Sequence, residues 1–176
     1  IIDSIKNFDL NNFDYSTIFL ALPHNISHKI IRKLHANANK PLPNIIDLSA
    51  DFRLDNIKNY ELNYHNEHSC PELLNNFVYG LAEVNFELIK NSSKISIPGC
   101  YPTSVLLPLI PIIKNEFIKT ENIIIDSKSG YSGAGKKFDK NNLFKNNDLN
   151  FYNYNTNKHR HISEISQELL KFSNNE

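Results

Sequence analysis

The chain has 176 residues, enough for one large or two small domains. Hydrophobic residues make up 40% and charged residues 22%, which are ordinary proportions for a globular protein. Its 19 Lys and Arg balance its 19 Asp and Glu, so no net charge steers the molecule towards nucleic acid or an anionic membrane, and we expect neither as a partner. Any anionic substrate must be held by locally placed donors.

Cysteine and methionine content bears on the setting of the chain. Its two cysteines are too few for a disulfide scaffold, so we expect a reducing, cytoplasmic location. The longest apolar run, near residues 104–113, holds two prolines and is too short to span a bilayer. There is no methionine, even at position 1, so we expect the chain to begin inside a longer protein.

Short apolar runs alternate with helical patterns in the first part of the chain. Residues 17–22 form an apolar run that ends at Pro23 and predicts a buried strand. The apolar spacing over 24–38 predicts a helix, and residues 44–48 predict a second buried strand. Strand, helix and strand with short connections predict an α/β fold with a parallel sheet.

The remaining elements follow the same reading. We expect strands at 77–79, 94–97 and 122–126, and helices over 85–91, 101–117 and 162–172. Asn85 suits the N-cap of the first of these helices, while Pro108 and Pro111 should kink or divide the second. A boundary near Lys119 predicts two regions, a parallel layer at 1–118 and the start of a second α/β domain at 119–176.

Cys100 lies in the run from Pro98 to Thr103, between a predicted strand and a predicted helix. At a helix N-terminus the dipole and the unpaired N–H groups favour a thiolate. The same N–H groups could hold the oxyanion that forms when a thiolate attacks a carbonyl. The alternative is a structural cysteine buried in a tight turn.

Two histidines, His159 and His161, precede the last predicted helix. An imidazole suits the acid/base partner of a thiol, and Glu164 could orient one of the rings. The alternative is a solvated basic turn, with Glu164 favouring the helix N-terminus.

Three further segments could bind ligands. The Ser- and Gly-rich run 129–135 permits close backbone approach, but it matches neither the P-loop nor the Rossmann fingerprint, and a flexible turn fits it equally well. The run Leu22 to His24 follows a strand, where ligands of open α/β sheets bind. Arg53 could clamp a carboxylate or phosphate, or form a surface ion pair with Asp51 or Asp55.

A zinc site is the weakest reading of the histidines and cysteines. His65, His68 and Cys70 are close in sequence, and His24 and His28 are four residues apart. Paired Cys-x-x-Cys and His-Glu-x-x-His motifs are missing, so we expect no metal.

Six motifs, taken in order, resemble the N-acetyl-gamma-glutamyl-phosphate reductases, a family of semialdehyde dehydrogenases. They are Leu22 to His24, Ile46 to Leu54, Val78 to Leu81, Pro98 to Thr103, Ser129 to Gly135 and His159 to His161. The resemblance spans about residues 17–172. It implies an NADP-dependent (NADPH) oxidoreductase of arginine biosynthesis that forms N-acetylglutamate 5-semialdehyde, as a homodimer or homotetramer, with a Rossmann-like domain followed by a catalytic domain.

The resemblance also implies roles for individual residues. Cys100 would form a thioester with the acyl group, His159 and His161 would share acid/base and substrate-positioning work in either order, and Glu164 would support them. Arg53 and Ser49 would contact substrate. The NADP site would be lined by Leu22, Pro23, His24, Ser129, Gly130, Ser132 and Gly133.

The sequence departs from the family pattern in several places. The Gly-rich dinucleotide loop and the last part of the second domain are absent from this chain. Asn25, Asn155 and Asn157 stand where the family usually has Gly, and Ile97 where it usually has Asn. Three alternatives stay open: a related dehydrogenase acting on aspartyl phosphate, a non-catalytic remnant, which these departures suggest, and a zinc-binding module.

Overall fold

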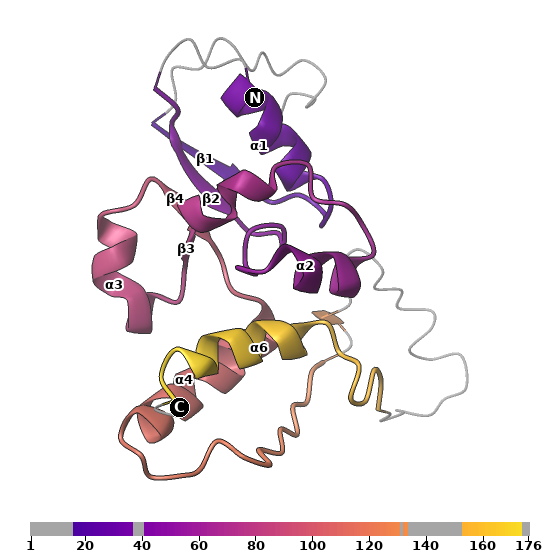
Figure 1. Cartoon of the computed structure of the whole chain (residues 1–176), viewed down its shortest axis with the longest axis vertical. Helices are drawn as coiled ribbons and strands as arrows, with labels where there is room; N and C mark the ends of the chain where they lie inside the picture. Colours follow the sequence, from indigo (N-terminus) through magenta and orange to yellow (C-terminus); the bar gives the residue numbers. More distant parts are fainter. Residues whose placement is uncertain (1–15, 37–40, 131, 134–152, 174–176) are drawn as a thin grey trace.

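A four-stranded parallel sheet organises the first part of the chain (Figure 1). The computed structural model describes residues 16–36, 41–130, 132–133 and 153–173. The strands, in spatial order, are β1 (Thr17–Leu20), β2 (Asn44–Asp47), β4 (Lys94–Ser96) and β3 (Val78–Tyr79). Every pairing between neighbours is parallel, which confirms the predicted α/β fold.

The helices are α1 (Ser27–Ala36), α2 (Ile57–Tyr64), the 3₁₀ helix η2 (Pro71–Asn76), α3 (Ala82–Lys90), α4 (Cys100–Lys114) and α6 (His161–Leu170). The four predicted helices are present as α1, α3, α4 and α6 with different bounds, and two further helices, α2 and η2, lie between β2 and β3. Figure 1 shows α6 lying along α4, and the two helices are in contact. No helix in the described part of the chain is both long and apolar enough to cross a membrane.

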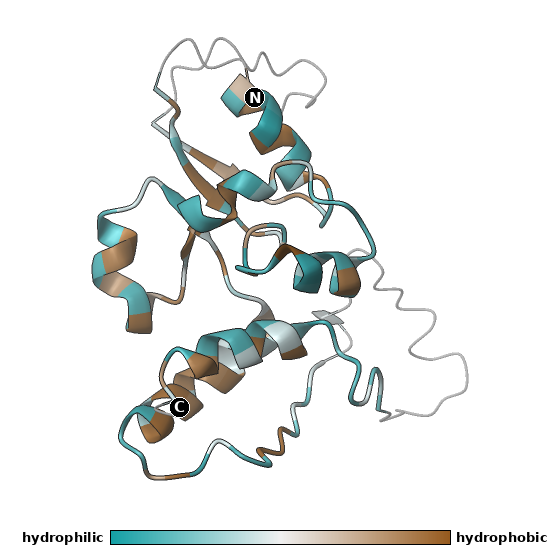
Figure 2. Ribbon diagram, viewed as in Figure 1, coloured by the Kyte–Doolittle hydropathy of each residue, from teal (hydrophilic) through white to brown (hydrophobic). Residues whose placement is uncertain are grey.

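Two apolar clusters hold these elements together. The first joins α1 to β1 and β2 through Leu20, Ile31, Leu34 and Ile45, all buried. The second lies between α4 and α6, and its buried members are Tyr79, Leu81, Val105, Leu106, Ile110 and Ile165. Figure 2 shows that α4 is apolar along most of its length, as a helix covered by another helix should be.

The two prolines inside α4 do not divide it, because the helix runs from Cys100 to Lys114. Pro108 and Pro111 both lie on its exposed side. The carbonyls that lose an N–H partner there can bond to water instead, which reduces the cost of each proline.

Two predicted details are wrong. The segment 122–126 is not a strand, and Ile124 and Ile125 are 93% and 44% exposed. A strand needs a neighbour for its backbone groups, and no described strand lies beside this one. Asn85 stands at a kink in α3, with non-helical φ and ψ of −111° and 27° where two helical segments meet, but its side chain does not cap the second segment: it donates to the Tyr79 carbonyl at 2.9 Å.

Asp51 fastens α1 to the loop after β2. Its buried carboxylate accepts from the backbone N–H of Asn25 (2.9 Å) and of His28 (3.1 Å), and from the Tyr60 hydroxyl (3.0 Å). A carboxylate at this position satisfies the free N–H groups of a helix and its dipole. The N-terminus of α1 is therefore already occupied by the protein's own negative charge.

Buried His28, His68 and Cys70 form a packed cluster beside α1. The two imidazole rings stack with centroids 4.7 Å apart. Nδ1 of His28 accepts from Ser69 N–H, and Nδ1 of His68 accepts from Cys70 N–H, so each ring carries its proton on Nε2. A protonated nitrogen cannot bind a metal, and in the described residues no group of three potential ligands converges on a metal position.

This cluster predicts a loss of stability in mild acid. Burial lowers the pKa of His68 to about 4, whereas the unfolded chain restores a value near 6.5. The folded state therefore prefers the neutral ring, and its stabilising contribution, complete above pH 6.5, is lost as the pH falls towards 4. We expect His68 to account for about 2 kcal/mol of the decrease in unfolding free energy between pH 7 and pH 5, measured by urea denaturation.

The control is His68→Asn, which keeps an acceptor near the position of Nδ1 and cannot titrate. The variant should lose about 2 kcal/mol less than the wild type between the two pH values. An identical decrease in both proteins would contradict a buried, neutral His68.

Candidate active site

Cys100 is the first residue of α4, and its side chain is exposed. It follows the edge of the sheet at which β4 ends, with Gly99 as the N-cap of the helix. The backbone and hydroxyl of Thr103 both donate to the Gly99 carbonyl, at 3.0 and 2.9 Å, which closes the first turn. The alternative of a buried structural cysteine is therefore wrong.

The first turn of α4 leaves two N–H donors beside the thiol. Pro102 has no N–H, and the N–H of Gly99 donates to Glu164. Within the described part of the chain, the N–H groups of Cys100 and Tyr101 have no acceptor. These two groups are placed to receive an oxyanion that forms next to the sulfur.

Glu164, in the first turn of α6, holds the residue before the nucleophile. Its side chain is buried, and Oε1 accepts from Gly99 N–H at 2.9 Å and from the Tyr79 hydroxyl at 2.8 Å. Its other oxygen, Oε2, lies 3.5 Å from Nη1 of Arg53. None of these partners is an imidazole, so Glu164 fixes the turn at Gly99 and does not orient a histidine ring as the sequence suggested.

Arg53 is buried, which overturns the alternative of a surface ion pair with Asp51 or Asp55. Its Nε donates to the Ile97 carbonyl at 2.6 Å and its Nη2 to the Leu48 carbonyl at 2.9 Å. The guanidinium thus binds the chain just after β2 and just after β4. Nη1 faces Glu164, so the donors of the guanidinium point into the protein. The predicted substrate contact of Arg53 stays a prediction.

His161 lies against Gly99. A Cβ atom added to Gly99 would stand 2.8 Å from Nε2 of His161 and 3.0 Å from Nη1 of Arg53, so only glycine leaves room for both side chains. Burial, followed by the charges of His159, Arg53, Arg160 and His24, lowers the pKa of His161 to about 3. The ring is therefore neutral at pH 7.

His159 is half-buried and lies between His161 and two tyrosines. Its ring centroid is 4.7 Å from that of His161, 5.2 Å from Tyr101 and 5.8 Å from Tyr154. Its Nδ1 accepts from the His161 N–H at 3.1 Å, which leaves the proton on Nε2. Burial and then the charge of Arg160 lower its pKa as well, so both imidazoles favour the neutral form.

Ser49 does not have the free hydroxyl that a substrate contact needs. Its Oγ donates to Asp47 at 2.7 Å and accepts from the Asp51 N–H at 3.1 Å, and the side chain is buried. A substrate could bind it only by replacing one of these bonds. The geometry therefore does not support the predicted role of Ser49.

The predicted cofactor residues lie in two places. Leu22, Pro23 and His24 follow β1, and Nδ1 of His24 accepts from the Ala50 N–H at 3.0 Å. Burial, with Arg160 and Arg53, lowers the pKa of His24 to about 4, so this ring is neutral too. The second group is exposed and consists of Ser129, Gly130, Ser132 and Gly133, whereas residues 131, 134 and 135 of that run lie outside the described residues.

The residues that depart from the family pattern suit the backbone conformation at their positions. Asn25, Asn155 and Asn157 have φ of 70°, 50° and 58°, the left-handed region that favours glycine. Asparagine is among the few other residues that tolerate it. At position 97 the hydrogen bonds use the backbone: the Ile97 carbonyl accepts from Arg53, and the Ile97 N–H donates to the Asp47 carbonyl.

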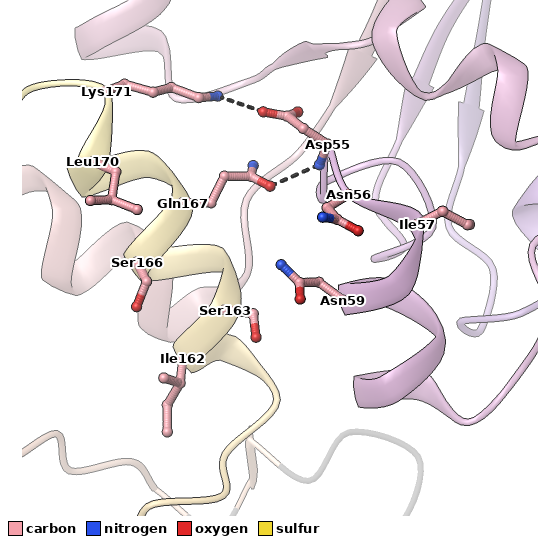
Figure 3. Close-up of a pocket in the computed structure, with 10 residues that line it drawn as sticks. All are labelled: Asp55, Asn56, Ile57, Asn59, Ile162, Ser163, Ser166, Gln167, Leu170 and Lys171. Atoms are coloured by element: carbon pink, nitrogen blue, oxygen red, sulfur yellow. Dashed lines mark hydrogen bonds and ion pairs between the residues drawn. The ribbon is translucent and has the colours of Figure 1, made fainter.

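A separate groove of ≈ 690 Å³ lies between α2 and α6 (Figure 3). Gln167 bridges its walls by accepting from the Asp55 N–H at 2.8 Å and donating to the Arg53 carbonyl at 3.0 Å. It contains none of the predicted site residues. The two hydrogen bonds of Gln167 connect α6 to the loop that carries Arg53.

Comparison with known proteins identifies the class. Residues 2–92 match the family described as semialdehyde dehydrogenase, NAD binding domain, and residues 100–176 match semialdehyde dehydrogenase, dimerisation domain. The chain belongs to the semialdehyde dehydrogenase family. The first match places β1, β2 and β3 of the parallel sheet in a region that matches an NAD-binding domain.

Similar curated proteins carry a more particular name. N-acetyl-gamma-glutamyl-phosphate reductase of Ehrlichia ruminantium (strain Gardel) is 45% identical over 96% of this chain and 46% of its own length. The protein of that name from Caldicellulosiruptor bescii is 49% identical over 86% of this chain and 43% of its own. The probable chloroplastic N-acetyl-gamma-glutamyl-phosphate reductase of Arabidopsis thaliana is 43% identical over 94% and 40%. These matches confirm the resemblance, and the chain spans a little under half the length of these relatives.

The crowding at Gly99 predicts a cost for any side chain there. Gly99→Ala should lower the unfolding free energy by about 1–3 kcal/mol, because the methyl group forces His161 or Arg53 to move. Gly133→Ala is the matched control for stability, since a Cβ there meets nothing nearer than 3.6 Å. Equal unfolding midpoints for the two variants in urea would show that the close approach at Gly99 is not present in solution.

Proposed function

We propose that the full-length protein reduces N-acetyl-gamma-glutamyl phosphate to N-acetylglutamate 5-semialdehyde and phosphate, with NADPH as the hydride donor, in arginine biosynthesis. One observation carries the proposal: an exposed thiol on the first residue of a helix, with two N–H donors free beside it and two neutral imidazoles close by. The names of the relatives support the choice of substrate. The division of the chain at 118/119 remains part of the proposal.

Cys100 acts as the nucleophile in this mechanism. Its thiolate attacks the acyl carbon, the C–O bond to the phosphate breaks, and a thioester to Sγ remains. During the attack the acyl oxygen gains negative charge, and the N–H groups of Cys100 and Tyr101 donate to it. The lowered pKa values of His159 and His161 favour neutral rings near pH 7, so His159 offers its Nε2–H as a hydrogen-bond donor and His161 keeps one nitrogen that accepts a hydrogen bond or a proton.

The described residues fit a dinucleotide only in part. When bound, NADPH supplies the hydride that reduces the thioester. His24 lies at the sheet edge where a nicotinamide cofactor binds, but the N-terminus of α1 is occupied by Asp51 and offers no place for a pyrophosphate. We therefore expect this chain alone to bind NADPH weakly or not at all in a fluorescence titration, and tight binding would contradict the proposed division of the site.

The full protein is proposed to act as a homo-oligomer, because residues 100–176 match a dimerisation domain. A cytoplasmic location also remains a prediction, since the Arabidopsis relative is named as chloroplastic.

The role of Cys100 can be tested by chemical labelling and by substitution. Cys70 is fully buried and burial raises its pKa to about 11, so iodoacetamide at pH 7 should label Cys100 and spare Cys70 in the folded protein. In the full-length protein Cys100→Ala should reduce phosphate- and NADP-dependent oxidation of the semialdehyde by about 10⁴-fold or more. Retained turnover in this variant would remove Cys100 from the mechanism.

A further inference from the structure

Two tyrosine hydroxyls meet beside the nucleophile. Tyr101 follows Cys100 in α4, and its Oη lies 2.6 Å from Oη of Tyr154, which belongs to the segment leading to His159. The hydrogen bond is on the protein surface, with Tyr154 49% exposed. Both rings also pack edge-on against His159. The pair therefore links the helix of the nucleophile to the histidines by a bond that stays open to a ligand.

Tyr154 also lies near the glycine-containing loop. Its hydroxyl interacts electrostatically with the Ser129 side chain and with Cys100. Tyr154 is thus the residue at which Cys100, Tyr101, Ser129 and His159 converge. This role of Tyr154 was not predictable from the sequence, because Tyr154 lies in a polar segment without a helical or strand pattern.

A count of protons shows what this arrangement offers. Two hydroxyl groups joined by one hydrogen bond carry two protons, and the bond uses one. One proton is left, and it must point away from the pair of hydroxyls towards solvent or a ligand. A hydroxyl that accepts from a neighbour is also a stronger donor, because hydrogen bonds in a chain polarise one another.

We propose that Tyr154 is a specificity-determining residue, whose hydroxyl, paired with that of Tyr101, donates a hydrogen bond to an anionic oxygen next to the carbon that Cys100 attacks. This anionic oxygen belongs to the acyl phosphate group of the substrate, an identification that rests on the proposed reaction. Burial and the bond to Tyr101 raise the pKa of Tyr154, so its hydroxyl remains a donor at neutral pH. The neutral imidazoles nearby do not supply a charge for this purpose.

Two alkylating reagents can isolate this contact without cofactor or substrate. Iodoacetate and iodoacetamide place the same carbon in front of Cys100, but only iodoacetate has an anionic oxygen next to it. In the full-length protein, the ratio of the iodoacetate rate to the iodoacetamide rate at Cys100 is followed by mass spectrometry of the peptide that contains it. Tyr154→Phe should lower this ratio about tenfold, the value of a hydrogen bond to a charged group, since it removes a hydroxyl and no charge.

Tyr64→Phe is the matched control, because it removes a tyrosine hydroxyl that takes no part in the bond between Tyr101 and Tyr154, from a ring that stacks on Tyr60. It should leave the ratio unchanged. Steady-state kinetics give a second readout: Tyr154→Phe should raise KM for phosphate in semialdehyde oxidation about tenfold, with a smaller change in kcat.

The two proposals fail in different ways. An unchanged reagent ratio in Tyr154→Phe would overturn the role of Tyr154, even if the protein is a reductase. A lowered ratio in a protein that lacks turnover would support the Tyr154 contact and contradict the proposed function.

Discussion

The arrangement of the site depends on the hydrogen bond from the Gly99 N–H to Glu164. Glu164 comes from α6, near the end of the described chain, and Gly99 stands immediately before the nucleophile. Tyr79, at the end of β3, donates to the same oxygen, while Arg53 pairs with the other oxygen and binds the chain after β2 and β4. One buried carboxylate therefore fixes Cys100 relative to three strand ends and to the histidines of α6. A buried ion pair of this kind adds little net stability, but it specifies a geometry.

The apolar pattern of the sequence was sufficient to predict the parallel sheet and the helices around it. The consecutive apolar residues Ile45 and Ile46 make the strand Asn44–Asp47 easy to recognise, and the spacing in α6 marks the side that packs on α4. The run 122–126 has the same apolar character, but a strand forms only with a neighbour, and the described residues provide none. Composition cannot tell whether a neighbour exists.

The sequence motifs predict which residues carry the chemistry of the site. Cys100, His159 and His161 follow from the family resemblance, and the structure brings them to one region. The partners of Arg53, Glu164 and Ser49 did not follow, because a side chain's direction is set by residues distant in sequence: Gly99 and Glu164 are 65 positions apart. Tyr79 and Tyr154 were missed for the same reason. The asparagines at left-handed positions argue against loss of the fold, since they keep the backbone that glycine would allow.

Amide hydrogen exchange at Gly99 tests the central claim most directly. The Gly99 N–H should exchange slowly in the wild type, and Glu164→Ala should accelerate it by about ten- to a hundredfold relative to the Ile45 amide, which is bonded in the sheet and reports global opening. Glu168→Ala, which removes another buried carboxylate of α6, should not change that ratio. If the Gly99 amide exchanges at the same relative rate in the wild type and in Glu164→Ala, this carboxylate does not hold the turn before the nucleophile.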